Sequence, residues 1–341
     1  MEPSTTNSSS TQRPATIRVL ATSGGFRTFV AFLAALLLFV VVFLIGVGTG
    51  VTGFAAAIED QGIVSESTMH KGNTSTIAIL DIFGSITGAT SSYATSAVNE
   101  ILDNNHIKAV VLRVDSPGGG VTASDEIWNE VQRLKNANLP VIASYGGVAA
   151  SGGYYISCCS DYIMAQETTI TGSIGVIASI MTFQGALEKL GIKPITLIAK
   201  DSPQKSVAND VYRNWTVKDK QKVTGFLDAA YSVFLSRVTE GRSHVIKDPQ
   251  TIESVANGSA YTSKEALENG LIDGIGYLSD ALTIAMEQSN LQNADPTILR
   301  FSPRQGGFGS LLGASSSSKS TDQLKSILHE LTSPDLLYLF N

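Results

Sequence analysis

The chain contains little cysteine for its length. Only two of its 341 residues are cysteines, and these two, Cys158 and Cys159, are adjacent. Adjacent cysteines rarely bridge each other because the disulfide geometry is awkward at that separation. Two cysteines alone also cannot form a zinc site. We therefore expect two buried thiols that pack in a core, with a redox role as the alternative, and we expect no metal and no cofactor.

Charge of either sign is also scarce. Lys and Arg number 24 against 30 Asp and Glu, which gives a formal net charge of −6, and charged residues make up only 16% of the chain. Phosphate binding requires clustered Lys and Arg, so this composition argues against a nucleic-acid partner. Glycine, in contrast, is frequent at 31 residues. Such a composition suits an α/β protein with many tight turns between strands and helices.

One segment near the N-terminus has no charge at all. Residues 28–58 lack any charged side chain, and most of this stretch is apolar. A helix of about 20 such residues spans the hydrocarbon core of a bilayer. Arginines precede the segment and acidic residues follow it, which places the N-terminus in the cytoplasm. We predict a cytoplasmic tail (1–27) and a single transmembrane anchor (28–50) in the cell membrane, with the rest of the chain extracytoplasmic. A secretory signal cleaved near 55–57 is the alternative.

The remainder of the chain divides into three parts. We predict a linker over 51–73, a folded domain over 74–290 and a flexible tail over 291–341, where glycine and serine become frequent. Within the domain, buried-strand patterns such as 106–114 alternate with stretches of helical periodicity such as 123–135. Repetition of strand, turn and helix indicates parallel strands joined by crossover helices. The fold class expected from this pattern is α/β.

Two glycine-rich turns follow predicted strands. In the first, DSPGGG (115–120), the backbone N–H groups can point into a cleft and form an oxyanion hole, although an ordinary turn is the alternative. The G-x-G-x-x-G spacing of a dinucleotide loop is missing. In the second, AASGGYY (149–155), Ser151 opens a helix, where the helix dipole stabilises an oxyanion. A serine that only caps the helix is the alternative.

The histidines do not supply a base for such a serine. The chain has four, and none lies in a setting that resembles a His–Asp pair. The G-x-S-x-G nucleophile elbow is also missing. A serine hydrolase built on this chain needs another base, and lysine is the usual substitute.

Several motifs together resemble the signal peptide peptidase A family. They occur in the family's order and approximate spacing, and they are DSPGGG (115–120), AASGGYYIS (149–157), TGSIGV (171–176), QKSVAND (204–210) and GSAYTSKEALENGLIDGIG (258–276). The resemblance covers about residues 74–290. It implies the fold of Clp-type peptidases and crotonases, in which stacked β-β-α units form clefts that bind extended peptides.

The resemblance also implies roles for five residues. Ser151 matches the family's nucleophile, and Lys205 matches its general base. Ser173 matches a hydroxyl that holds the lysine amine. Gly119 and Gly152 match the two backbone donors of the oxyanion hole.

Lys200 is the competing candidate for the base. It is followed by an aspartate, as the family's lysine often is, but it also fits a second lysine-like position five residues before the catalytic one. A lysine accepts a proton only when its amine is neutral, and burial favours that neutral form. A carboxylate beside the amine opposes it, so we predict that Asp201 and Asp210 point away from Lys205.

For function, the resemblance implies a membrane-anchored serine endopeptidase with a Ser–Lys dyad. Its substrates are then extended apolar peptides, such as the signal-peptide remnants that export leaves in the membrane. The resemblance also implies a ring-shaped homo-oligomer in which the serine of one protomer faces the lysine of its neighbour. The rivals are a non-catalytic membrane scaffold and a crotonase-like acyl-CoA enzyme, for which the chain lacks a clear acidic catalytic pair.

Overall fold

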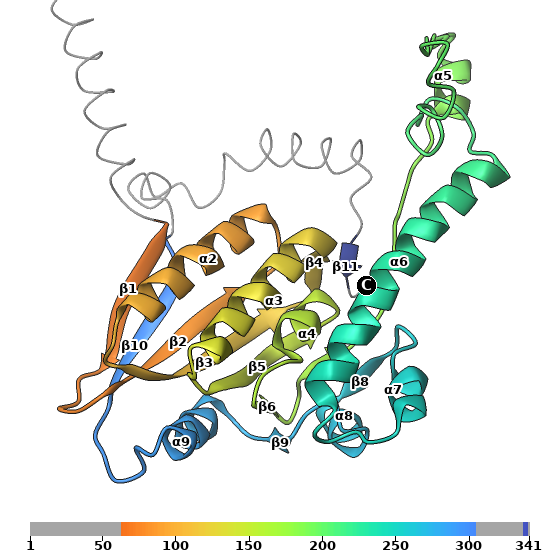
Figure 1. The fold of residues 1–341 in the computed structure, drawn as a ribbon. Helices are drawn as coiled ribbons and strands as arrows, with labels where there is room; N and C mark the ends of the chain where they lie inside the picture. Colours follow the sequence, from red (N-terminus) through yellow and green to blue (C-terminus); the bar gives the residue numbers. More distant parts are fainter. Residues whose placement is uncertain (1–62, 305–336, 340–341) are drawn as a thin grey trace, which may run out of the picture. The chain divides into compact units, whose positions relative to one another are not determined.

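The computed structural model of the protein describes residues 63–304 and 337–339 (Figure 1). The predicted cytoplasmic tail and anchor, residues 1–50, lie outside these ranges. Among the described helices, none has both the length and the apolar character needed to cross a membrane.

A mixed sheet lies at the centre of the described domain. Its strands are β1 (Val64–His70), β2 (Thr76–Phe83), β3 (Ile107–Ser116), β5 (Val141–Ala150), β6 (Tyr162–Ala165), β7 (Ile170–Gly172), β8 (Ala260–Thr262), β9 (Gly274–Ile275) and β10 (Thr297–Pro303). The main path runs β1-β10-β2-β3-β5-β6-β9, while β7 pairs with β5 and β8 with β7. From β10 to β9 along this path the neighbours are parallel, whereas β1 and β8 join antiparallel. A separate pair consists of β4 (Gly118–Gly120) and β11 (Leu337–Leu339).

The central strands are buried on both faces. In β2, Ala78 and Leu80 belong to one apolar cluster, while Ile77 and Ile79 belong to a second cluster on the opposite face. Strands covered on both sides read as continuous apolar runs, which is why β2 has the sequence TIAILDIF. The sequence thus builds a sheet that requires helices on both faces.

Helices supply that cover (Figure 1). One face carries α2 (Gly88–Asp103), α3 (Val121–Asn136) and α4 (Gly152–Ser157), and the other carries α9 (Leu278–Gln288). The remaining helices are α5 (Gln184–Lys189), α6 (Val217–Arg242), α7 (Pro249–Val255) and α8 (Ser263–Glu268). The predicted mixed α/β architecture with alternating strands and helices is confirmed.

The sheet extends beyond the range 74–290 predicted for the domain. Strand β1 lies within the predicted linker and β10 within the predicted tail, and β10 is inserted between β1 and β2. The boundaries therefore need correction, because the sheet includes residues from 64 to 303. Most side chains of β1 (VSESTMH) are exposed, so this edge strand lacks the alternating apolar pattern that marks a strand in the sequence.

The two cysteines are free and buried in the main apolar cluster. Burial raises the pKa of the Cys158 thiol well above its usual range, and it raises the pKa of the Cys159 thiol to about 12. Neither thiol is therefore ionised to a useful extent at neutral pH, and the thiolate is the reactive form. The prediction of buried packing thiols is confirmed.

Candidate active site

Ser151 connects the end of β5 to the start of α4 in a strained conformation. Its φ of 53° and ψ of −115° lie outside the regions that a residue with a Cβ prefers. The backbone is fixed on both sides, because the Ser151 N–H donates to the Gly172 carbonyl and the Ser151 carbonyl accepts from Tyr155, each over 2.8 Å. Strain of this kind persists where the surroundings impose it and is concentrated at functional sites.

The side chain of Ser151 has no structural partner. It is fully buried, its Oγ finds no hydrogen-bond partner in the described chain, and it does not cap α4. The alternative interpretation of Ser151 as a helix-capping serine is therefore wrong.

Gly119 lies where no side chain fits. A Cβ atom at this position would come within 2.1 Å of the Ile86 carbonyl oxygen. The same carbonyl accepts a hydrogen bond from the Gly120 N–H, and the Ile86 N–H donates to the Gly118 carbonyl, both over 2.9 Å. The DSPGGG turn is thus held against the segment that follows β2, and this close packing requires glycine at position 119.

Gly152 and Gly119 lie side by side next to the nucleophile candidate. A Cβ atom on Gly152 would lie 3.1 Å from both the Gly118 Cα and the Gly119 nitrogen, and 2.7 Å from the Oγ of Ser124. The structure therefore brings together Ser151 and the two predicted oxyanion donors. Ser124, which lies in the first turn of α3, is absent from the residues that the sequence analysis selected.

Ser173 is linked to Ser151 through Gly172, which lies next to Ser173 in the chain and is hydrogen-bonded to Ser151. It follows Gly172, the residue whose carbonyl accepts the Ser151 N–H, and β7 pairs with β5 at this point. The Ser173 side chain is buried, and its φ of 49° is again in the left-handed region. One strained serine, Ser151, thus donates the hydrogen bond between the strand ends, and the other, Ser173, directly follows its acceptor.

Lys205 lies on a different part of the chain. We call residues 183–216 the arm; it contains α5, and none of its residues is buried. Ala208, three residues after Lys205, donates its N–H to Asp219 in the first turn of α6 over 2.9 Å. Arg213 clamps the same carboxylate at 2.8 Å and, mainly through this hydrogen bond, holds the pKa of Asp219 well below its usual range. The Lys205 loop is thus fastened to the N-terminal end of α6.

The C-terminal half of α6 packs beside α4, the helix that follows Ser151. The ring of Phe234 lies 4.9 Å from that of Tyr155 in α4. Fifteen residues separate Asp219 from Phe234, which corresponds to roughly 22 Å along the helix axis. Figure 1 shows α5 at the far end of α6 from α4. Lys205 is exposed and is not hydrogen-bonded to the buried Ser151, so a single chain does not bring the predicted dyad together.

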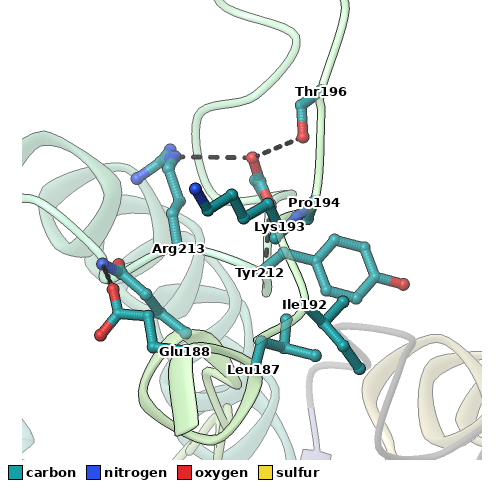
Figure 2. Close-up of a pocket in the computed structure, with 10 residues that line it drawn as sticks. Leu187, Glu188, Ile192, Lys193, Pro194, Thr196, Tyr212 and Arg213 are labelled. Atoms are coloured by element: carbon teal, nitrogen blue, oxygen red, sulfur yellow. Dashed lines mark hydrogen bonds and ion pairs between the residues drawn. The ribbon is translucent and has the colours of Figure 1, made fainter. Parts of the chain in front are cut away.

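A cavity of about 500 Å³ lies within the arm (Figure 2). Its walls combine the apolar side chains of Leu187, Ile192 and Tyr212 with charged ones. Inside it, the Asp210 carboxylate accepts a hydrogen bond from Thr196 at 3.1 Å and lies 3.8 Å from the Nε of Arg213. The charge of Asp210 is therefore compensated by partners other than Lys205.

A strand from the C-terminal end lies along the glycine turn. Strand β11 pairs antiparallel with β4, with Leu337 opposite Gly120 and Leu339 opposite Gly118. These residues fall within the predicted flexible tail, although their apolar character is a signal of pairing. The edge of β4 thus accepts an extended segment, which is the way many peptide-binding sites hold their ligands.

Comparison with known proteins identifies the family. The pattern of peptidase family S49 matches residues 133–292, and that of Clp protease matches residues 75–182. A putative signal peptide peptidase SppA of Enterococcus faecium is 33% identical over 274 residues, which cover 77% of each chain. A putative protease of Synechocystis is 30% identical over 275 residues, which cover 77% of this chain and 95% of that protein.

Two further similarities have narrower coverage or lower identity. Protease 4 of Haemophilus influenzae is 32% identical over 269 residues, but this chain spans only 42% of its length. Among solved structures, a mutant of the 1510-N membrane-bound stomatin-specific protease matches with a TM-score of 0.45 and 18% identity, over 68% of this chain and 100% of that one. The sequence matches, above all that to the Enterococcus protein, show that the chain belongs to peptidase family S49, the family of signal peptide peptidase A, and that it is a serine protease.

Proposed function

We propose that the protein is a membrane-anchored endopeptidase that cleaves extended apolar peptides, including signal-peptide remnants, with Ser151 as nucleophile and Lys205 as base. The proposal rests on one observation, namely that a strained serine, two closely packed glycines and a strand-binding edge lie next to each other. A strained serine, Ser151, lies beside the closely packed Gly119 and Gly152, on an edge that already accepts an extended strand. The name of the Enterococcus relative, a putative signal peptide peptidase, supports the substrate class.

In the proposed reaction, the neutral amine of Lys205 removes the proton of Ser151 as Oγ attacks the scissile carbonyl carbon. The N–H groups of Gly119 and Gly152 donate hydrogen bonds to the resulting oxyanion. The lysine then gives its proton to the leaving amine, which yields an acyl-enzyme. Water activated by the same amine hydrolyses this ester, and Ser173 holds the amine in place throughout.

A neighbouring subunit supplies the lysine in this proposal. The arm exposes large apolar side chains, among which Leu190, Ile195 and Leu197 are 71%, 83% and 90% exposed. Large apolar side chains that are this exposed and this frequent on one segment favour an interaction surface there. We propose that the arm packs on the next protomer of a ring-shaped homo-oligomer, so that Lys205 of one chain reaches Ser151 of another. Burial at such an interface also favours the neutral amine that a base requires.

Fluorophosphonate labelling tests the enzymatic part of the proposal, because the reagent forms a covalent bond only with an activated serine. The wild-type oligomer is expected to be labelled, the Ser151→Ala variant is not, and an extended apolar peptide should slow labelling by competing for the edge of β4. A non-catalytic scaffold or an acyl-CoA enzyme would leave the wild type unlabelled, and that result would reject the proposal.

The membrane location is proposed from the charge-free segment 28–50 and the arginines before it. The full chain is expected to stay with the membrane pellet after an alkaline carbonate wash. A chain that lacks residues 1–52 should appear in the supernatant as a matched control. Release of the full chain by carbonate would contradict a retained anchor and favour a cleaved signal.

A further inference from the structure

Ser124 places a buried hydroxyl beside the two glycines of the candidate active site. Its side chain is fully buried, and its Oγ has no hydrogen-bond partner among the residues that the structure describes. The position that a Cβ on Gly152 would occupy lies 2.7 Å from this Oγ and 3.1 Å from the Gly119 nitrogen. The hydroxyl and the two predicted oxyanion donors therefore surround the same small space.

An unsatisfied hydroxyl at this position requires an explanation. A buried polar group without a partner costs free energy, and alanine would fill the same helical position without that cost. A serine within a helix commonly donates to the carbonyl four residues earlier, but Ser124 makes no such bond to Gly120. The hydroxyl thus has a proton that no described acceptor takes up and that a new acceptor can receive.

We propose that Ser124 is a third hydrogen-bond donor to the oxyanion, in addition to the N–H groups of Gly119 and Gly152. This inference rests on the proposed protease function, because an oxyanion forms there only if Ser151 attacks a carbonyl. A substrate strand that replaces β11 on β4 brings its scissile carbonyl to this space. As negative charge develops on the carbonyl oxygen, the Ser124 hydroxyl turns toward it and forms a charge-assisted bond.

The position of Ser124 also explains why residue 152 is a glycine. The first turn of α3 carries Ser124 toward the backbone of residue 152. A side chain on residue 152 would collide with this Oγ. The missing side chain therefore leaves room for the hydroxyl as well as for the approach of the Gly119 turn.

The Ser124→Ala variant of the full-length oligomer tests the inference. We expect kcat to fall by about a hundredfold to a thousandfold, the range for losing one oxyanion donor, with little change in KM. Affinity for a peptide aldehyde, which forms a tetrahedral adduct with the serine, should fall by a similar factor, whereas affinity for the matching non-reactive peptide alcohol should not. The thermal unfolding midpoint should stay the same or rise, because no existing bond is lost.

Ser160→Ala provides the matched control. Ser160 is equally buried, and its Oγ is likewise without a partner in the described chain, but it lies in the turn between α4 and β6. This variant should keep wild-type kcat and wild-type aldehyde affinity.

Three results would overturn the role of Ser124. The first is that kcat and aldehyde affinity are unchanged in Ser124→Ala. The second is that kcat falls only for peptides with certain side chains directly before the cleaved bond. The third is that a smaller folded fraction of the variant accounts for the whole fall in activity. The second result would make Ser124 a wall of a side-chain pocket, and the third would make it a structural residue. In all three cases the protease proposal stands as long as fluorophosphonate labels Ser151. If Ser151→Ala is still labelled and active, the assignment of Ser151 as the nucleophile fails, and the proposed function with it.

Discussion

Replacing Ser151 by alanine is expected to reduce peptide hydrolysis by at least about a thousandfold while leaving the fold intact, since loss of the nucleophile removes the covalent route. The fold should tolerate the change because the Ser151 Oγ forms no hydrogen bond that alanine would break. The bonds that fix this residue come from its N–H and carbonyl, and alanine retains both. The measurements are the initial rate with a fluorogenic apolar peptide and the thermal unfolding midpoint.

Ser157, at the far end of the helix that Ser151 precedes, should show the opposite result, with lower stability and unchanged activity. Ser157 Oγ is bonded to the Tyr145 hydroxyl and to the Gly153 carbonyl, each over 2.8 Å, and it lies outside the proposed catalytic group. Ser157→Ala should lower the stability by about 1–3 kcal/mol because it leaves the buried Tyr145 hydroxyl without this partner. Its rate per folded protein should be close to that of the wild type. Substantial activity in Ser151→Ala would remove that residue from the nucleophile role.

Mixing two inactive variants should restore activity if the dyad crosses a subunit interface. The Ser151→Ala and Lys205→Ala variants are each expected to be inactive. Their oligomers are dissociated into subunits, mixed in equal amounts and reassembled. Each site needs an intact serine from one protomer and an intact lysine from its neighbour, so random mixing completes about a quarter of the sites. The physical reason is the separation of the two residues at opposite ends of α6 within one chain.

Lys200→Ala is the control for this experiment. It lies on the same exposed arm, five residues before Lys205, and should retain much of the activity on its own. A mixture that recovers nothing would show that each chain completes its own site and would reject the shared dyad. An inactive Lys200→Ala together with an active Lys205→Ala would transfer the base role to Lys200.

The sequence predicted those features that depend on neighbours along the chain. The apolar run of β3 and the helical periodicity of α3 are local patterns, and both elements form where they were predicted. The turn at Gly119 and the sharp entry of Ser151 into α4 were also visible, because glycine-rich motifs between a strand and a helix mark such turns.

Features that depend on contacts between distant segments were missed. Strand β1 is polar and exists because β10, more than 200 residues later, pairs with it. Strand β11 likewise depends on β4 and not on its own propensity. Ser124 resembles any helical serine until Gly152 is folded against it. The 54 positions between Ser151 and Lys205 do not reveal how far apart the two residues lie in space. That distance follows from the course of α6, which holds them apart.

Under the proposed function, the pairing of β11 with β4 makes this segment a competitor of the peptide substrates. A segment tethered to its own binding edge meets it at an effective concentration that a free peptide of equal affinity rarely reaches. The apparent affinity of any free peptide is reduced by the fraction of time for which β11 occupies the edge. The described pairing covers three residues, from Leu337 to Leu339, and a peptide that pairs over a longer stretch is expected to displace them more readily. On this proposal, short peptides are expected to gain less access to Ser151 than long ones.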